Sequence, residues 1–190
     1  MRILLSASDK AELKGFSDDY LKVVTGVGPI AAASLSMKAA LEFKADAIVS
    51  IGSAGAISDS LEIGKAYSFG TVLTPDQNLT KFHLSLGSTL SQNRATIREL
   101  RSADCSSSIV LYSSGAFSSS ILEAHKALLA DASDMEAYGV AMTAHNLSIP
   151  FYAIKLITDR VGESAKVGDV SFKLREGRAE LIALVESLVR

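Results

Sequence analysis

Short apolar runs alternate with longer segments of helical spacing along this chain of 190 residues. Apolar runs bounded by turn residues predict strands over residues 3–6, 20–25, 46–51, 66–73, 109–112 and 151–157. Helical spacing predicts helices over residues 30–43, 121–130, 135–146 and 172–189, with weaker signals after residue 8 and at residues 95–101. Because strands and helices alternate, we expect an α/β fold: a single domain over residues 1–190 with a central mixed sheet flanked by helices.

The last predicted strand and the helix before it carry the clearest candidate chemistry. The strand follows Pro150 and is largely apolar, which predicts burial on both faces, although Lys155 indicates that this burial is incomplete. Glu136 begins the helix, and Asp159 comes just after the strand. Ligands of open α/β sheets bind at the carboxyl ends of the strands, so both carboxylates are candidate site residues. The alternative is that Asp159 is a turn or capping residue and that Glu136 only complements its helix dipole.

Composition argues against several classes of function. The 19 Lys and Arg residues nearly balance the 21 Asp and Glu residues, so no nucleic-acid surface is expected. No apolar run approaches the roughly 18 residues of a membrane span. Cys105 is the only cysteine, which argues against a disulfide framework and indicates a cytoplasmic setting. His83, His125 and His145 lie far apart without ligand spacing, so we interpret them as surface or structural residues and expect no metal.

Two glycine-rich turns follow predicted strands. The first reads Gly26-Val27-Gly28-Pro29-Ile30-Ala31. It fits the G-x-G-x-x-A pattern of dinucleotide sites, with Asp46 at the spacing of the acid that binds ribose. Asp46 precedes its strand, however, and would lie at the wrong end of the sheet, so the dinucleotide site is the weaker interpretation. The second turn, residues 52–55, contains two glycines that let a ligand approach the backbone, and Ser53 adds a hydroxyl donor.

Five motifs in order carry a family resemblance. They are the Gly-Val-Gly turn with its alanine-rich helix, Ile51-Gly52-Ser53-Ala54-Gly55-Ala56, Ser114-Gly115-Ala116-Phe117, Asp134-Met135-Glu136-Ala137 and Ile157-Thr158-Asp159. With them the chain resembles the purine nucleoside phosphorylase and uridine phosphorylase superfamily, and within it the 5'-methylthioadenosine/S-adenosylhomocysteine nucleosidases. The resemblance implies a three-layer nucleoside phosphorylase-like fold, a small-molecule nucleoside substrate, no cofactor and a homodimer. The chain is shorter than is usual for that family between residues 16 and 25, and the match is poor over residues 74–108.

The resemblance also implies roles for the acidic residues. Asp159 corresponds to the acid that protonates the purine at N7, and Glu136 to the carboxylate that binds the ribose hydroxyls, with Met135 packed on the sugar. Glu12 corresponds to the acid that positions the attacking water. The chemistry agrees with these roles, because cleavage of a glycosidic bond uses one group to protonate the leaving group and another to guide water. No metal is required.

The remaining implied roles concern the base and the ends of the sugar. Phe117 would stack on the base, and the backbone of Ser118 would read its edge. Ser53 would line the side from which the nucleophile attacks, and Phe172 would cover the 5' end of the sugar. Thr158 and Lys155 would orient Asp159. For Phe117 and Phe172 the alternative is plain core packing.

Arginine positions bear on the choice of nucleophile. Phosphorylases of this superfamily hold phosphate with arginines, one just before the Gly-Ser turn and typically another in the first loop. Here Ser50 takes the first position, and residues 7–12 contain Lys10 but no arginine. Since arginine is the preferred bidentate partner of phosphate, water is favoured as the nucleophile. Arg94, Arg98 and Arg160 are the arginines that would have to approach from elsewhere in a phosphorylase.

We therefore predict hydrolysis of the N-glycosidic bond of a purine nucleoside, with 5'-methylthioadenosine or S-adenosylhomocysteine as the expected substrate. Three alternatives stay open. One is a futalosine hydrolase, which shares the fold and the acid pair. The others are a purine nucleoside phosphorylase and a non-catalytic nucleoside-binding protein, the last of which is supported by the shortened first half of the chain.

Overall fold

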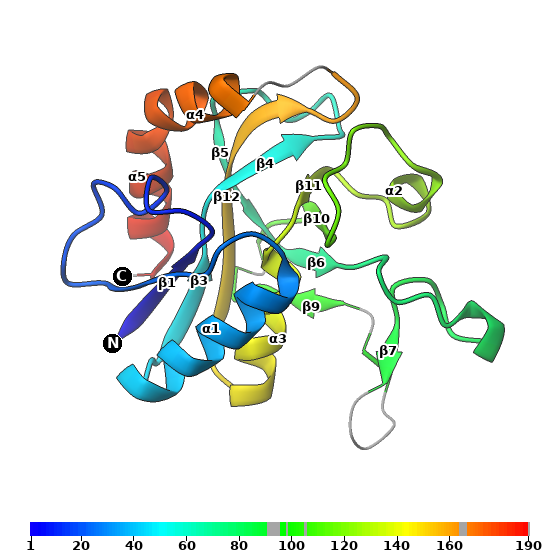
Figure 1. The fold of residues 1–190 in the computed structure, drawn as a ribbon, viewed down its shortest axis with the longest axis horizontal. Helices are drawn as coiled ribbons and strands as arrows, with labels where there is room; N and C mark the ends of the chain where they lie inside the picture. Colours follow the sequence, from blue (N-terminus) through cyan, green and yellow to red (C-terminus); the bar gives the residue numbers. More distant parts are fainter. Residues whose placement is uncertain (91–95, 98, 105, 164–166, 190) are drawn as a thin grey trace.

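The computed structural model describes residues 1–90, 96–97, 99–104, 106–163 and 167–189. Within these ranges a mixed sheet of ten strands runs through the molecule (Figure 1). Its strands are β1 (Ile3–Ala7), β2 (Leu21–Val24), β3 (Ala47–Ser50), β4 (Ser53–Ala56), β5 (Ala66–Phe69), β6 (Thr71–Leu73), β9 (Leu100–Arg101), β10 (Val110–Ser113), β11 (Ala132–Asp134) and β12 (Phe151–Arg160). The strand order is β2-β1-β3-β12-β4-β11-β10-β6-β9, and β5 pairs with β12 beside this path.

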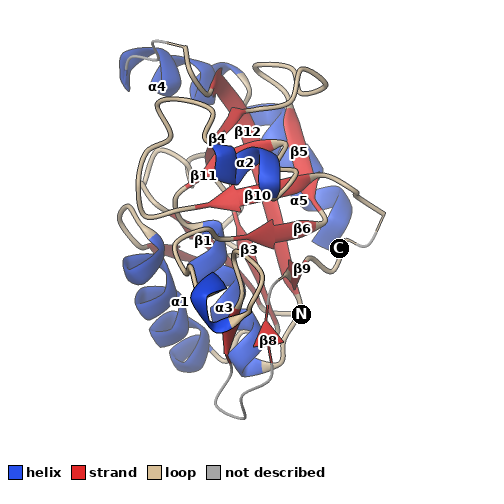
Figure 2. Cartoon of the chain, turned by 90° about the vertical axis from the view of Figure 1, so that its right-hand side faces the viewer, coloured by secondary structure: helices blue, strands red, loops and turns tan. Residues whose placement is uncertain are grey.

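Helices cover both faces of this sheet. They are α1 (Pro29–Phe43), α2 (Glu123–Ala127), α3 (Ala137–Leu147), α4 (Val167–Glu176) and α5 (Arg178–Val189), with a 3-10 turn at Thr80–Phe82 and a small separate sheet of β7 (Thr89–Leu90) and β8 (Thr96–Ile97). Figure 2 shows α1 and α5 on opposite sides of the sheet. The predicted α/β fold, with a central mixed sheet flanked by helices, is confirmed. No helix within the described ranges is long and apolar enough to cross a membrane.

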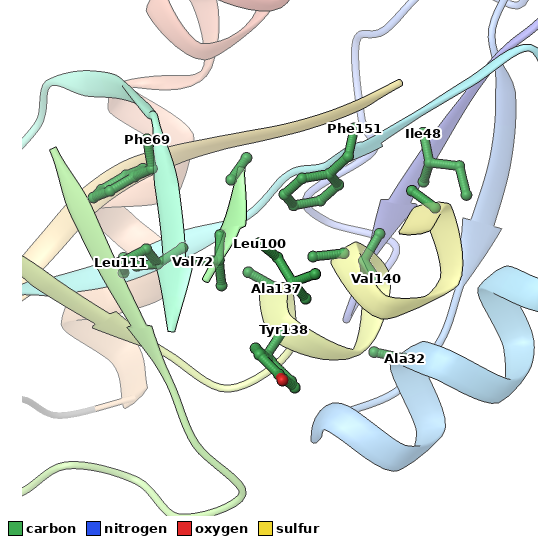
Figure 3. Packing of buried hydrophobic residues seen from close by; sticks show 14 of the residues in the cluster. Ala32, Ile48, Phe69, Val72, Leu100, Leu111, Ala137, Tyr138, Val140 and Phe151 are labelled. Carbon is green, nitrogen blue, oxygen red and sulfur yellow. The ribbon is translucent and has the colours of Figure 1, made fainter. Parts of the chain in front are cut away.

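Alternation of side chains along the central strands divides the core in two. In β1, Leu4 joins the cluster that also contains Ala32 of α1 and Val140 of α3. Its neighbours Ile3 and Leu5 join the cluster on the other face, with residues of α5. Figure 3 shows the first cluster, in which the side chains of the sheet meet α1 and α3. The central strands are therefore packed against helices on both faces, and this packing holds the ends of the strands in place.

Helices α1 and α3 approach each other very closely at the end that faces the site. A Cβ atom on Gly139 would lie 2.1 Å from the carbonyl oxygen of Pro29, so no larger residue fits there. Pro29 occupies the first turn of α1, where its missing N–H is not needed and its fixed φ favours the helix. This contact brings the turn at residues 26–28 next to the start of α3.

The strand predictions needed several corrections. Three short strands were missed here: β4, which we expected to be a turn, β7, where no strand was expected, and β11, which precedes α3. The expected strand over residues 66–73 is two strands that meet at Gly70, where a side chain would collide with the carbonyl oxygen of Ser107. The last strand runs on to Arg160, so Asp159 lies within it rather than after it.

The helix predictions were wrong at three places. Residues 9–15 form turns and not a helix. Around residues 95–101, where the described positions are 96–97 and 99–101, the chain forms β8 and β9, and residues 95 and 98 lie outside the description. The expected closing helix is divided into α4 and α5 at Gly177, where a Cβ would lie 2.4 Å from a methyl carbon of Leu156. Cys105 and Arg94 also lie outside the described residues.

Candidate active site

A cavity opens where β4, β11 and β12 meet the loop at residues 113–122. Its volume is about 170 Å³, below the roughly 300–1,000 Å³ of pockets that enclose drug-sized ligands, so its enclosed part suits a ring system rather than a whole nucleoside. Six of the eight predicted site residues line it: Ser53, Phe117, Ser118, Met135, Glu136 and Asp159. The other lining residues used below are Gly55, Ser133, Asp134, Thr158 and Val170.

Asp159 faces this cavity from β12. The pairing of β12 with β4 shifts register between Ile157 and Asp159, and such a bulge turns the side chains beside it. The Oγ1 hydroxyl of Thr158 donates to Oδ1 of Asp159 at 2.8 Å. Oδ2 lies 3.3 Å from the position that a Cβ on Gly55 would take, so the absence of a side chain there leaves room for the carboxylate. Thr158 therefore orients Asp159, as expected.

Glu136 occupies the N-cap position of α3, where its side chain makes no capping hydrogen bond, and it lines the same cavity. Its Oε1 accepts the backbone N–H of Gly28 at 2.9 Å, across the close contact between α1 and α3. Burial raises the pKa of Glu136, and the carboxylates of Asp134 and Glu12 raise it further, against the opposite effect of Lys155 and of the Gly28 N–H. The fold thus holds a carboxylate with a raised pKa at one side of the cavity.

Glu12 lies beneath the cavity rather than in its wall, and it is buried. Its Oε2 accepts the backbone N–H of Ser8 at 2.8 Å, the Ser8 hydroxyl at 2.9 Å and the Asp9 N–H at 3.2 Å. Its Oε1 accepts the N–H of Ser53 at 3.3 Å. Gly52 makes room for it, since a Cβ there would lie 2.5 Å from Oε1, and its φ of +136° is itself unfavourable for other residues. Glu12 therefore joins the first loop to the start of β4.

Lys155 was predicted to interrupt the burial of its strand, and this was wrong. Its side chain is only 1% exposed, and Nζ lies 2.9 Å from Oδ2 of Asp134, which is also buried. Nζ further donates to the carbonyl oxygen of Ile51 at 3.2 Å. Lys155 thus contacts Asp134 and Ile51, where we had expected it to orient Asp159. Burial alone would lower the pKa of Lys155, but Asp134, Glu136 and Glu12 outweigh that effect and raise it.

Phe172, like Glu12, is a predicted site residue that the structure does not bring to the cavity wall. It lies on α4 and is 48% exposed, although Val170 of the same helix does line the cavity. Phe117 is 64% exposed at the rim, so it is not a core residue, and the core-packing alternative is wrong for it. Ser133 was missed as a site residue, and so was Asp134, which pairs with Lys155. The available signal was an acid two positions before Glu136 together with a lysine inside an apolar run.

The structure also bears on the alternatives. Asp46 precedes β3 and accepts hydrogen bonds from the N–H and the guanidinium of Arg2, far from the turn at residues 26–28. This geometry removes the acid from the dinucleotide interpretation. Arg160 donates to the carbonyl oxygens of Ser58 and Leu61, and Arg94 and Arg98 lie outside the described residues. Among the described residues of the cavity wall there is no arginine, and no described His, Cys, Asp and Glu residues cluster as a metal site would require.

Comparison with known proteins found similarities in sequence and in fold. A sequence model described as "Phosphorylase superfamily" matches residues 105–190. The 5'-methylthioadenosine/S-adenosylhomocysteine nucleosidase of Staphylococcus aureus (strain bovine RF122 / ET3-1) is 26% identical over 192 residues, covering 92% of this chain and 84% of the relative.

Two solved structures resemble the whole fold. The S-adenosylhomocysteine nucleosidase from Streptococcus pyogenes in complex with 5-methylthiotubericidin superposes with a TM-score of 0.83 at 19% identity, covering 100% of this chain and 98% of that one. The futalosine hydrolase of Helicobacter pylori strain 26695 gives a TM-score of 0.82 at 15% identity, covering 99% and 98%.

Proposed function

We propose that this chain, which belongs to the phosphorylase superfamily, is a nucleosidase that hydrolyses the N-glycosidic bond of purine nucleosides. We assign 5'-methylthioadenosine and S-adenosylhomocysteine as its substrates, because its Staphylococcus aureus relative is named as the nucleosidase of these two compounds. The observation that carries the proposal is the meeting of Asp159 and Glu136 in one cavity, with Glu12 buried directly beneath Ser53.

In this proposal Asp159 donates a proton to N7 of the purine as the base leaves. The hydroxyl of Thr158 and the missing side chain of Gly55 support that role, since the first holds the carboxyl group and the second leaves room for it at the cavity wall. A positioned acid of this kind typically contributes about 10²–10⁴-fold to the rate. The purine then leaves as a neutral base rather than as an anion.

Glu136 binds the ribose hydroxyls, and Met135 packs against the sugar. The N–H of Gly28 holds Oε1, and we assign Oε2 to the sugar. A charged acceptor makes stronger hydrogen bonds than a neutral one, so this carboxylate can hold the ribose firmly while the positive charge develops on the sugar. The negative charge of Glu136 also favours that developing oxocarbenium ion electrostatically.

Glu12 and Ser53 serve the attacking water. Glu12 lies next to Ser53, whose side chain lines the cavity, so a water in front of Ser53 would be within reach of the acid after a small movement of the first loop. Phe117 is placed at the rim, where it can stack on the base, and the backbone of Ser118 would read the edge of the base. We assign Phe172 to the 5' end of the sugar, which requires α4 to carry it toward the cavity.

Water is the nucleophile in this proposal. Ser50 stands where a phosphorylase would carry an arginine, and it is buried. No arginine is present among the described cavity residues, and Arg160 is bound to the turn at residues 58–61. These features support hydrolysis over phosphorolysis, because arginine side chains are the preferred partners of a phosphate dianion.

Two further features belong to the proposal. We infer a homodimer, since the groove between α1 and α3 carries exposed apolar side chains such as Val27 and Ile30, 66% and 85% exposed. Light scattering at micromolar concentration tests this, and a fully active monomer would contradict it. We infer a cytoplasmic location from the single cysteine, which fits a reducing compartment. Fractionation of the source cells tests the location, and recovery outside the cytoplasm would contradict it.

The test of the proposed function is release of free base from a small panel of nucleosides. The purified chain is incubated with 5'-methylthioadenosine, S-adenosylhomocysteine, futalosine and inosine, and the products are separated by chromatography. Adenine from the first two substrates is the expected result. Base released from futalosine alone would assign the futalosine hydrolase alternative instead. Binding of all four without any base release would make the chain a nucleoside-binding protein.

A further inference from the structure

A buried histidine lies behind the wall of the cavity and is used by none of the roles above. His125 belongs to α2, is 1% exposed, and packs against the ring of Tyr112 with 4.1 Å between ring centroids. Its Nδ1 accepts the backbone N–H of Leu122 at 2.8 Å. A neutral ring that accepts at Nδ1 must carry its proton on Nε2. Burial lowers the pKa of His125, which agrees with a neutral ring.

The proton on Nε2 sets the direction of a short chain of hydrogen bonds. Nε2 lies 3.3 Å from Oγ of Ser118, so the ring donates to that hydroxyl. Oγ of Ser118 lies 3.0 Å from Oγ of Ser133. The two serines have two hydroxyl hydrogens between them, and one of these makes the bond that joins them. Because His125 supplies a hydrogen and accepts none, the second hydroxyl hydrogen is left for the cavity, which both serines line.

The sheet places this donor opposite Asp159. Gly55 of β4 pairs with Ser133 of β11 on one side and with Asp159 of β12 on the other. Neighbouring strands lie about 4.8 Å apart, so the two outer residues are roughly 10 Å apart across Gly55. Gly55 carries no side chain, so β4 places nothing but backbone between the hydroxyl and the carboxylate, and Cγ2 of Val161 and Oδ2 of Asp159 lie 3.2 and 3.3 Å from the position that a Cβ would take. We place a flat bicyclic base in the cavity that these residues line, with one edge toward Ser133 and the other toward Asp159.

We propose that Ser133, held by Ser118 and His125, is a hydrogen-bond donor that selects the base by an acceptor atom on the edge away from Asp159. The inference rests on the proposed function for the identity of the ligand, a purine. The proposal assigns base selection to the hydrogen-bonded side chains of His125, Ser118 and Ser133, in addition to the backbone of Ser118. His125 acts as a positioning residue, since it touches the serine and not the base.

Binding of free bases tests the proposal without relying on turnover. Calorimetry compares adenine, 1-deazaadenine and 3-deazaadenine, in which a ring nitrogen acceptor is replaced by C–H, for the parent chain and Ser133→Ala. One hydrogen bond is worth about 0.5–1.5 kcal/mol, so Ser133→Ala should weaken adenine binding by about 3- to 10-fold. One of the two deaza compounds should bind the parent more weakly by the same factor and lose nothing further in the variant.

Two further variants separate donation from structure. Ser133→Thr keeps the hydroxyl and should keep adenine binding, whereas Ser60→Ala, at an exposed turn, is the matched serine control and should change nothing. His125→Gln introduces a side-chain oxygen that can accept the hydroxyl hydrogen of Ser118, so fewer hydroxyl hydrogens are left for the base. The variant should therefore show a smaller ratio of adenine affinity to deazaadenine affinity than the parent. In the Ser133→Ala background it should leave that ratio unchanged.

The outcomes also separate this inference from the proposed function. Equal losses for all three bases in Ser133→Ala, no loss for any of them, or a parent that binds no adenine would overturn the inference. A parent that shows the expected discrimination but releases no base from 5'-methylthioadenosine would overturn hydrolysis and leave the inference standing. A parent that releases base without discriminating among the three compounds would overturn the inference alone.

Discussion

Lys155 Nζ lies 2.9 Å from Oδ2 of Asp134, and the two side chains are 1% and 0% exposed. The same Oδ2 accepts the backbone N–H of Ala137 at 3.0 Å, so the ion pair also holds the start of α3. Glu136 lies between these two residues in sequence and faces the cavity. Oδ1 of Asp134 has no hydrogen-bond partner among the described residues. The pair therefore positions Glu136 at the cost of a partly unsatisfied carboxylate.

Removing the lysine should be strongly destabilising. Lys155→Met leaves Asp134 as an unpaired buried charge, and breaking a buried pair in this way costs about 3–5 kcal/mol. Urea unfolding measures the loss in free energy of unfolding. Lys126→Met, at an exposed lysine paired with Glu123, is the matched control and should cost less than about 1 kcal/mol.

A double variant checks the cause. Lys155→Met with Asp134→Asn removes both charges while the amide oxygen can still accept from Ala137, so it should recover most of the lost stability. If the double variant is no more stable than Lys155→Met alone, the loss reflects packing of the lysine and not the stranded carboxylate.

Glu136→Gln should separate stability from function. Glu136 has a pKa above its ordinary value of 4.5 in the folded chain, chiefly because it is buried. Between the unfolded pKa and the raised folded pKa the folded chain holds more protons, so this residue's contribution to stability falls as pH rises through that window. Glutamine has no such titration. In thermal unfolding, the difference in unfolding temperature between Glu136→Gln and the parent should change in favour of the variant from about pH 4.5 upward. It should reach a plateau above the folded pKa.

The same variant should be a poor enzyme. Its neutral oxygen can still accept from Gly28, but it loses the charge assigned to the ribose, so turnover of ribosides should fall. A variant with parental activity on ribosides would remove Glu136 from sugar binding, whatever its stability.

Asp159→Asn tests the acid directly. Asparagine keeps the shape of the side chain and its contact with Thr158 but has no proton to transfer, so turnover should fall by about 10²-fold or more while adenine still binds. Steady-state rates and calorimetry measure the two effects. Asp18→Asn, at an exposed carboxylate paired with Lys22, is the control and should leave both unchanged. Near-normal turnover by Asp159→Asn would exclude it from the mechanism.

Glu12→Gln should lose both activity and stability. A carboxylate that accepts hydrogen bonds at both oxygens is replaced by an amide whose NH2 cannot accept, and the amide cannot take a proton from water. Asp9→Asn is the matched comparison, because Asp9 is an exposed acid of the same loop. The opposite ranking, with Asp9→Asn inactive and Glu12→Gln active, would move the water-positioning role to Asp9.

The parts of this fold that the sequence predicts are those with strong apolar patterns. β12 and α1 follow from long patterned segments, and Asp159 and Glu136 were found because each borders such a segment. β11 was missed because Ala-Ser-Asp is short and polar, and β4 because Ser-Ala-Gly-Ala lacks the branched and aromatic residues that mark strands. Both are strands because neighbouring strands pair with them, which is information that no local pattern contains.

Close contacts between distant segments explain most of the other differences. Gly70 and Gly177 lie where their elements divide, and neither position has room for a side chain because Ser107 and Leu156 come close to them in space. Lys155 is buried because Asp134, on another strand, neutralises it. His125 was interpreted as surface or structural, and its burial behind Ser118 depends on the packing of α2 against the strands. For the two glycines and for Lys155 the deciding partner is far away in sequence.

The central claim is hydrolysis, and the most direct measurement identifies the sugar product. The chain is incubated with 5'-methylthioadenosine in the presence and absence of inorganic phosphate, and the sugar is analysed by mass spectrometry with the rate followed by adenine release. The account predicts free methylthioribose at a rate that phosphate does not increase. Methylthioribose 1-phosphate as the product, or release of adenine only when phosphate is present, would contradict it.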